Sequence, residues 1–458
     1  MSSASPPRFR WGSPGTGWET LPAEAQELIV ASGVRSWSEV QSGVQSFNEQ
    51  WRPLRPPIMT EAMFGALHEV ASRVLELILA ACQRRAITVG ELRRAMGVAE
   101  GEIALLNEAE TLSENLLVAG RPDILLSGGV PKFVEFNIDS ALGGALDSDM
   151  IATRFAEVYL ADGITDRIGL HAPPPAIEGR FRALADWLGP ARDARLAMVM
   201  DLAAPHAGLV DPQQFLDKFA PFAAQGAAMA GLALVPYWLQ WLRLDEQQRL
   251  LAADEPVPAV FRMFIADKAP DCPGLRALET ALLAGTVRMF TSSATWLLSN
   301  KLVLAWLWQD LDQLAEADQA VVRAHIPRTL LLDAGLIQDA VTRQQDLVLK
   351  PGGGSAGIDV LLGRDASPEL WRRAVERAVE RGGFLLQDYV ESDLLSMDFV
   401  DMRTGAVVHQ PVPWCFGPYQ YGRAQCGGLV RLGFPGGGAV MNIDRGALLS
   451  GVAILPST

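Results

Sequence analysis

Apolar residues recur three and four positions apart through the first quarter of the chain, and this spacing predicts helices. The clearest stripe runs from Met63 to Ile78, where one face of an amphipathic helix would be apolar. Residues up to about Gly15 are rich in Ser, Pro and Gly and show no period. We therefore expect residues 1–118 to form a mainly helical N-terminal region, whose sequence holds no catalytic motif.

The pattern then changes from helical spacing to alternation. A short apolar run at 123–127 is followed by Gly128 and Gly129, and residues 132–137 alternate between polar and apolar. Two short strands joined by a Gly-Gly turn predict a β-hairpin. We assign residues 119–170 to a segment built around this hairpin, and a Pro-rich stretch just beyond it marks a boundary.

Strands and helices alternate in residues 171–295. Apolar runs at 196–200 and 232–237 flank a helical stretch at 213–230, and further strands are expected at 261–264 and 287–290. A strand–helix–strand unit predicts a parallel sheet, so we expect an α/β lobe here. No G-x-G-x-x-G sequence follows the first strand, so no dinucleotide site is predicted.

Residues 296–458 mix helices with strands that return antiparallel. We predict a helix from Asn300 to Leu311 and another at 368–381. Strands are predicted at 346–350, 384–389, 396–401 and 407–409. The predicted fold class is therefore α+β combined with α/β, in which a parallel α/β lobe and a nucleotide-binding lobe follow the helical N-terminal region.

The composition narrows the classes of function. The chain has 458 residues and a formal net charge of −14, which argues against non-specific nucleic-acid binding. The N-terminus lacks the apolar core of a secretion signal, and the most apolar stretch, 223–242, is interrupted by Gln, Gly and Pro. The four cysteines of the chain form no C-x-x-C pair. We therefore expect a cytoplasmic protein with buried thiols and no membrane span.

The predicted hairpin carries the sharpest set of polar residues. Glu135 and Asn137 lie two apart on one strand, so their side chains share a face, and the hairpin can bring Asp123 opposite them. Two carboxylates and an amide oxygen are hard ligands that suit magnesium together with phosphate oxygens. Arg121 should share this face and could stabilise developing negative charge. An exposed face with ordinary polar residues is the alternative for this segment taken alone.

A glycine-rich loop follows the predicted strand that ends at Lys350. Gly352, Gly353 and Gly354 come directly after Pro351, and Gly357 follows. Glycines let backbone N–H groups approach a phosphate, and the lysine would add a positive charge. The lysine precedes the glycines, so this is not a Walker A loop. A simple glycine-rich turn is the alternative.

Three weaker signals complete the set. The strand ending in Gln387, Asp388, Tyr389 and Val390 could pair with an adenine edge, although an ordinary edge strand is the default. Lys301 would sit in the first turn of its helix, where its positive charge opposes the helix dipole. A bound anion would explain this placement; a solvated surface lysine is the alternative. A structural role for His409 is favoured over that of a base.

The order of these motifs is similar to that of the circularly permuted ATP-grasp ligases, in particular the synthetase domain of glutathionylspermidine synthetases. In most ATP-grasp enzymes the metal ligands follow the lysine and hinge segments, whereas here the hairpin comes first. The resemblance spans roughly Ala119 to the C-terminus. The motifs that carry it are residues 121–123, 135–137, 299–301, 349–354 and 387–390.

The resemblance implies a role for each matching residue. Asp123, Glu135 and Asn137 would hold two magnesium ions, and Arg121 would stabilise the acyl-phosphate reaction. The residues implied to contact ATP phosphates are Lys301, Lys350, Gly352, Gly353 and Gly354. Those implied to contact adenine are Gln387, Asp388, Tyr389 and Val390. Gly428, Arg431 and Asn442 would belong to the closing segment of the family.

The implied activity is an ATP- and magnesium-dependent ligation of a small carboxylic acid to a small amine, through an acyl phosphate. The sequence departs from the family's pattern in two places, which limits how much of the family's function can be expected here. The loop after Lys350 lacks the family's charged residues, and the N-terminal helices match no part of the family. The substrates therefore do not carry over. A phosphotransferase that stops at a phosphorylated product, and a catalytically inactive ATP-grasp scaffold, are the alternatives.

Overall fold

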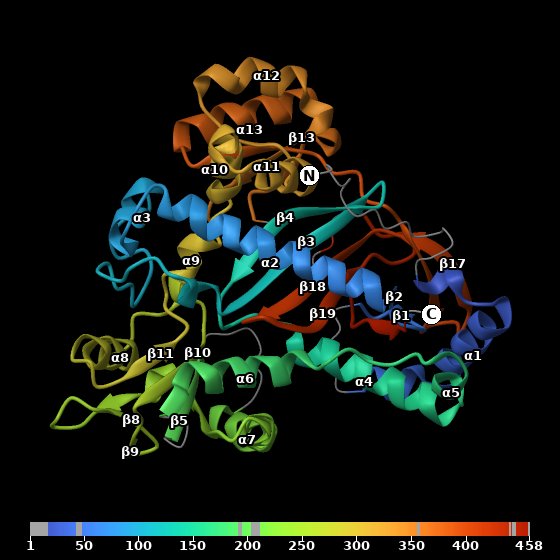
Figure 1. The fold of residues 1–458 in the computed structure, drawn as a ribbon, viewed down its shortest axis with the longest axis horizontal. Coiled ribbons are helices and arrows are strands. Elements are labelled where there is room, and N and C mark those ends of the chain that lie inside the picture. The colour runs from blue at the N-terminus through green and yellow to red at the C-terminus, as the bar shows by residue number, and fades with distance from the viewer. Residues whose placement is uncertain are drawn as a thin grey trace.

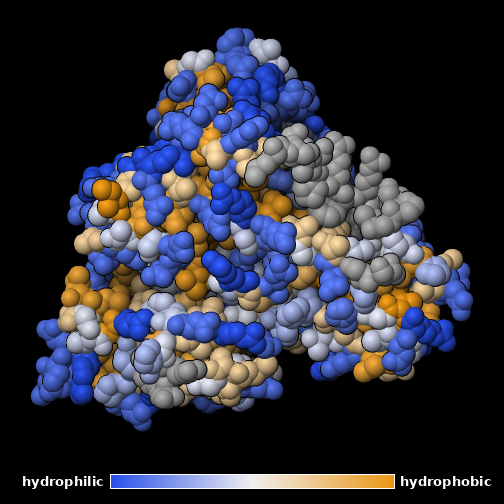
Figure 2. All heavy atoms as spheres, viewed as in Figure 1, coloured by the Kyte–Doolittle hydropathy of each residue, from blue (hydrophilic) through white to orange (hydrophobic). Residues whose placement is uncertain are grey.

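The structure is a computed structural model that describes residues 17–42, 48–190, 195–202, 211–354, 358–438, 441 and 446–456. Figure 1 shows three groups of elements around a central sheet, which the long helix α2 (Glu61–Gln83) crosses. Hydrophilic residues cover most of the face in Figure 2, with apolar residues in small groups between them. Among the described helices, none is both long and apolar enough to cross a membrane.

The central sheet is built on the hairpin that the sequence predicts. Strands β3 (Ala119–Ser127) and β4 (Val130–Ile138) pair antiparallel around Gly128 and Gly129, both of which have positive φ. The carboxylate of Asp393 accepts both glycine N–H groups at 2.9 and 2.7 Å, which fixes the turn. Three later strands, absent from our prediction, complete the sheet in the order β20-β19-β18-β3-β4: β18 (Trp414–Tyr421), β19 (Ala424–Leu432) and β20 (Leu448–Ser450).

Helix α2 covers the apolar face of this hairpin. The Thr60 side chain caps its N-terminus by accepting the Met63 N–H at 3.2 Å. Most of the predicted apolar stripe is buried, in the same main core as Phe136 and Ile138 of β4. Because neighbouring residues of a strand point to opposite faces, Glu135 and Asn137 point away from α2.

The N-terminal region, which we expected to be mainly helical, also contains turns and short strands. It contains helices α1 (Ala23–Val40) and α3 (Val89–Ala95), but residues 100–117 are mostly turns that end in a short 3-10 helix, Glu114–Leu117. It also contributes two short strands: β1 (Trp51–Pro53) pairs with β16 (Leu395–Asp401), and β2 (Ile58–Thr60) pairs with β21 (Ala453–Leu455). Local periodicity missed these strands because their partners lie far along the chain.

The predicted parallel α/β lobe is present. Strands β5 (Arg195–Met200), β6 (Ala233–Trp238), β10 (Ala259–Met263) and β11 (Arg288–Phe290) form an all-parallel sheet in the order β11-β10-β5-β6. Helix α7 (Pro212–Met229) joins β5 to β6, as the strand–helix–strand pattern predicts. Helices α6 (Ala176–Leu188) and α8 (Pro273–Leu283) and a small sheet of β7 (Arg243–Leu244), β8 (Leu250–Ala252) and β9 (Glu255–Pro256) belong to the same region.

A separate four-stranded sheet is formed by strands between residues 329 and 388. Strands β12 (Thr329–Leu331), β15 (Phe384–Asp388), β13 (Leu347–Pro351) and β14 (Leu361–Leu362) pair antiparallel in that order. Helix α13 spans Pro368–Arg381, as predicted, and Ser367 caps it. The remaining elements are β17 (Val407–Val412) beside β16, and helices α4 (Ala145–Ala161), α5 (Ile164–Ile168), α9 (Thr295–Leu298), α10 (Leu302–Gln309), α11 (Glu316–His325) and α12 (Ile337–Thr342).

Candidate active site

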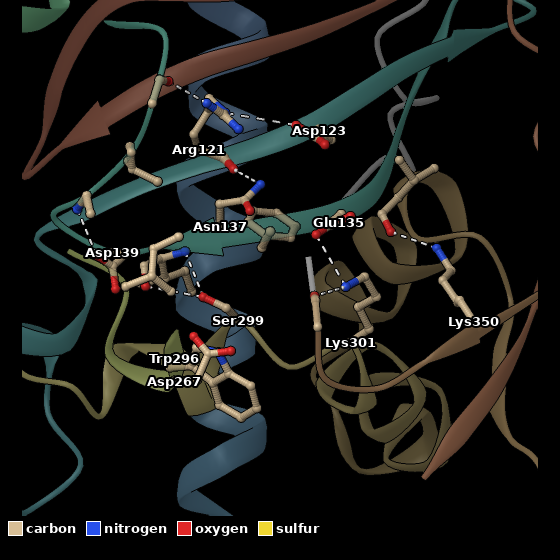
Figure 3. A pocket seen from close by; sticks show the side chains of 18 of the residues that line it. Arg121, Asp123, Glu135, Asn137, Asp139, Asp267, Trp296, Ser299, Lys301 and Lys350 are labelled. Carbon is tan, nitrogen blue, oxygen red and sulfur yellow. Dashed lines mark hydrogen bonds and ion pairs between the residues drawn. The ribbon is translucent and has the colours of Figure 1, made fainter. Parts of the chain in front are cut away.

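A cavity of about 510 Å³ lies between the hairpin, the loop after β13, and the start of α10. It is lined by residues from segments far apart in the sequence: the hairpin, the loop after β10, the α9–α10 junction and strand β19. Figure 3 shows that the predicted metal ligands and both predicted lysines point toward this space. The two groups of residues that the sequence analysis placed in one site therefore meet in the structure.

The hairpin register explains why its four polar residues share one face. Asp123 lies directly opposite Glu135, and Arg121 lies opposite Asn137. Positions two apart on a strand point to the same side, so both cross-strand pairs face the cavity. The register shifts between Asp123 and Ile124, directly after the last of these positions.

Asp123 is the most enclosed carboxylate of this face. The guanidinium of Arg431, on β19, contacts it at 2.5 Å, and Arg121 Nε lies 4.0 Å away. Burial acts to raise the pKa of Asp123, but the charges of Arg431 and Arg121 outweigh burial and hold the pKa below its usual value. Asp123 is therefore ionised at neutral pH.

Lys301 connects the hairpin to the glycine-rich loop. Its Nζ lies 3.3 Å from Glu135 and donates to the Gly354 carbonyl at 3.0 Å. Its backbone N–H donates to the Gly352 carbonyl at 2.8 Å. Lys301 occupies the N-cap position of α10 and not its first turn, since the helix begins at Leu302. Its ammonium group nevertheless faces the cavity.

Lys350 enters the cavity from the end of β13. Its Nζ donates to the Val134 carbonyl of the hairpin at 3.1 Å, and the residue is 7% exposed. Burial lowers the pKa of Lys350 to about 8, and the charge of Lys301 acts in the same direction, against Glu135 and Asp123. A bound polyanion would favour the charged form of this lysine.

The loop after Lys350 is closely packed where the structure describes it. A Cβ at Gly352 would lie 2.8 Å from Asn300 Oδ1, and one at Gly353 would lie 3.1 Å from the Trp296 ring. Both positions therefore favour glycine for lack of space. Ser355, Ala356 and Gly357 lie outside the described residues.

The donor set fits magnesium by its chemistry. Two carboxylates and an amide are hard oxygen ligands. Asn137 uses its Nδ2 to donate to the Arg121 carbonyl at 3.3 Å, which leaves its Oδ1 as the acceptor. Asp123 Oδ1 is buried with no hydrogen-bond partner among the described residues. An ion at this position would provide the missing partner.

The predicted adenine segment lies apart from this cavity. None of Gln387, Asp388, Tyr389 and Val390, all within the described part of the chain, lines it. The Gln387 amide donates to Thr329 Oγ1 at 2.9 Å, and the N–H groups of Asp388 and Tyr389 donate to the backbone carbonyls of Arg328 and Asp346. The adenine role of these four residues stays a prediction.

Three other residues noted in the sequence have distinct positions. His409 does not line the cavity; its Nδ1 lies 2.9 Å from Asp398 in the β16–β17 pair, in keeping with a structural role. Gly428 lies on β19 where a Cβ would overlap the Phe416 ring. Asn442 lies outside the described residues.

The structure adds lining residues that the sequence analysis did not assign. Asp139 continues the alternation of Glu135 and Asn137, so the period itself could have revealed it. Asp267 and Trp296 have no comparable signal, because only tertiary packing brings the loop after β10 and helix α9 to the hairpin.

Comparison with known proteins places the fold. No protein-family model and no curated protein matches the sequence. The structure of a glutathione synthetase-like effector, GSS30, from Globodera pallida is similar over 94% of this chain and 97% of that chain, with a TM-score of 0.53 and 13% identity.

Two further similar structures are more distant. D-alanyl-alanine synthetase A from Vibrio cholerae has a TM-score of 0.29 and 13% identity, over 48% of this chain and 67% of that chain. A RimK domain ATP-grasp protein from Sphaerobacter thermophilus has a TM-score of 0.26 and 15% identity, over 53% and 88%. The circular permutation stays a prediction. The fold of this chain is therefore similar to that of the glutathione synthetase-like effector GSS30.

Proposed function

We propose that this protein is an ATP- and magnesium-dependent ligase that joins a small carboxylic acid to a small amine. The observation that carries the proposal is the convergence of Asp123, Glu135 and Asn137 with Lys301 and Lys350 on one cavity. Hard oxygen ligands beside buried cations suit a metal-bound triphosphate better than a neutral ligand. The ATP-grasp-like fold supports the same conclusion.

The residues of the site divide into two tasks. Lys301 and Lys350 would bind phosphate oxygens, since both ammonium groups face the hairpin across the cavity. Asp123, Glu135 and Asn137 would hold magnesium, which when bound neutralises charge on the β- and γ-phosphates. Binding of a metal at Asp123 would compete with the Arg431 ion pair and leave Arg431 able to contact a substrate anion.

The proposed reaction has two steps. A carboxylate oxygen of the acid attacks the γ-phosphorus, the bond to the bridging oxygen breaks, and ADP leaves with an acyl phosphate formed. The amine nitrogen then attacks the acyl carbon; the C–N bond forms, the C–O bond to phosphate breaks, and phosphate and a proton are released. Arg121 would stabilise the oxyanion of the second step.

Placement of Arg121 supports this role. Its Nη1 donates to the Gly143 carbonyl at 2.8 Å, and its guanidinium lies 5.8 Å from the Tyr419 ring centroid. Tyr419 Oη donates to the same carbonyl at 2.7 Å. These contacts fix the side chain, while its Nε is buried without a hydrogen-bond partner among the described residues. A guanidinium held in this way needs little reorganisation to stabilise an oxyanion.

ADP release tests the proposal directly. The purified chain is incubated with ATP and magnesium against a panel of carboxylic acids with and without amines, and products are weighed by mass spectrometry. ADP release with an amide product supports the ligase. A phosphorylated product that persists in the presence of every amine indicates a phosphotransferase. ATP binding without ADP release under any combination indicates an inactive scaffold.

A further inference from the structure

The candidate active-site cavity has two parts of opposite character. Arg121, Lys301, Lys350 and Arg431 make the part beside the hairpin cationic. Figure 3 shows the carboxylate of Asp267 and the ring of Trp296 beside Ser299, on the side of the same cavity away from Asp123. The proposed function uses only the cationic part, so the acidic part has no role in it.

Asp267 differs from the other acidic residue of this part, Asp139. Asp139 Oδ2 pairs with the fully buried Arg262 at 2.8 Å, and its Oδ1 accepts the Ala141 N–H at 2.7 Å. Its charge is therefore neutralised by the protein. Asp267 Oδ1 is buried and has no hydrogen-bond partner among the described residues. A carboxylate oxygen withdrawn from water without a donor is destabilising, and a bound donor would remove this penalty.

The surroundings of Asp267 specify what kind of donor fits. The Trp296 ring lines the cavity, and a Cβ at Gly353 would lie only 3.1 Å from it, so the loop after Lys350 limits the movement of the ring. An aromatic face and a carboxylate together attract an alkylammonium group, through the ring quadrupole and the opposite charge. The cavity lining also includes the apolar residues Ala141, Leu142, Ile265 and Val360, together with the cation Lys268, which follows Asp267 in the chain.

We infer that Asp267 and Trp296 form the subsite for the amine substrate, and that this substrate enters as a primary ammonium ion carrying a compact apolar group. The inference rests on the proposed ligase function and deepens it. The ammonium would bind at Asp267, and the acid at the cationic part, so that the two reactants share one cavity. The ammonium would then lose a proton to solvent before its nitrogen attacks the acyl phosphate. Asp267 here binds the substrate and holds no role in phosphate or metal binding.

Binding of a simple probe pair tests this subsite without turnover. Benzylammonium and the neutral benzyl alcohol differ in charge but little in shape. The full chain is titrated calorimetrically, with and without magnesium and a non-hydrolysable ATP analogue. It should bind benzylammonium, and its affinity for benzyl alcohol should be lower by roughly tenfold or more. Asp267→Asn, which keeps the side-chain shape, should weaken benzylammonium binding by roughly tenfold or more and leave benzyl alcohol unchanged.

A matched control lies four residues away. Asp271 pairs with Arg276, its side chain is 85% exposed, and it does not line this cavity. Asp271→Asn should bind benzylammonium as the wild type does, and thermal unfolding of both variants checks that they fold. Absence of benzylammonium binding by the wild type in both nucleotide states would overturn the inference, as would equal binding by the folded Asp267→Asn variant. ADP release tests the ligase proposal separately, so the two can fail independently.

Discussion

At the scale of single residues, the hairpin carboxylates differ in their surroundings. Asp123 is almost enclosed, with Arg431 at 2.5 Å, whereas the Glu135 side chain is 26% exposed and has Lys301 at 3.3 Å. Removal of Asp123 would leave a buried guanidinium without its partner and would lower stability as well as activity. Glu135 is therefore the better position for a test of metal binding.

Glu135→Gln removes the charge of this ligand and keeps its shape. We expect magnesium-dependent ADP release to fall roughly a hundredfold or more, because metal-mediated charge neutralisation contributes several kcal/mol to phosphoryl transfer. The measurement is steady-state ADP release, with thermal unfolding as the check on folding. Glu157→Gln, at a 56% exposed side chain on α4, is the control and should behave as the wild type. Wild-type ADP release by Glu135→Gln would contradict the metal assignment.

Lys350 should make ATP affinity depend on pH. Its pKa is lowered to about 8, so it is mainly protonated at pH 7 and mainly neutral at pH 9. Affinity for the triphosphate should therefore fall as the pH rises through about 8, by roughly tenfold when the charge is lost. Calorimetric titration with a non-hydrolysable ATP analogue at pH 7 and pH 9 measures this change.

Lys350→Arg provides the control for that experiment, since a guanidinium stays charged over this range. Its affinity, even if lower overall, should not change between the two pH values. An equal fall in both proteins would assign the pH effect to another group. The residues near enough to contribute are Lys301, Glu135 and Asp123, which all act on the pKa of Lys350.

At the scale of elements, glycines in two helices allow the effect of close packing on stability to be distinguished from the effect of helix propensity. Gly33 lies inside α1, where a Cβ would come within 1.9 Å of the Leu54 carbonyl oxygen. Gly33→Ala should lower the free energy of unfolding by about 1–3 kcal/mol or more, because the backbone of the segment before β2 must move. Chemical denaturation measures the change.

Gly65 in α2 is the matched position. The nearest atom to its Cβ would be Gln425 Oε1 at 3.9 Å, so alanine fits. Gly65→Ala should raise the free energy of unfolding by about 0.5–1 kcal/mol through helix propensity alone. A destabilised Gly65→Ala, or a stabilised Gly33→Ala, would contradict the packing described for these helices.

The elements that sequence pattern predicted are those that local chemistry determines. Helix α13 starts at a capped proline and ends at a positive-φ glycine, and the β3–β4 hairpin turns on two such glycines. Strand β18 escaped prediction because all eight of its residues are buried, so it shows no alternation. Strand β1 has three residues and a partner some 350 positions away, which periodicity cannot detect.

The residues of the candidate site also differ in whether local sequence could predict them. Asp123, Glu135 and Asn137 were predictable because one hairpin carries all three, and Lys350 because a strand and a glycine-rich loop frame it. Asp267 and Trp296 reach the cavity only through the packing of the α/β lobe and α9 against the hairpin. Arg431 arrives from β19, a strand that was not predicted.

At the scale of the whole molecule, the N-terminal region is joined to the C-terminal third. Arg55 is fully buried, donates to Asp398 of β16 at 2.8 Å, and lies 3.6 Å from the Trp18 ring centroid. Strand β2 pairs with β21 near the end of the chain. These contacts, with α2 packed on the central sheet, make the N-terminal region part of the support for the hairpin.

The central claim is that the hairpin and the two lysines bind one metal-bound nucleotide. A crystal structure with a non-hydrolysable ATP analogue and manganese tests it most directly, because manganese gives an anomalous signal at the metal position. We expect manganese peaks at Asp123, Glu135 and Asn137, with phosphate oxygens at Lys301 and Lys350. The same crystal structure would show where the adenine binds. Nucleotide bound elsewhere, or manganese away from the hairpin, would contradict the account.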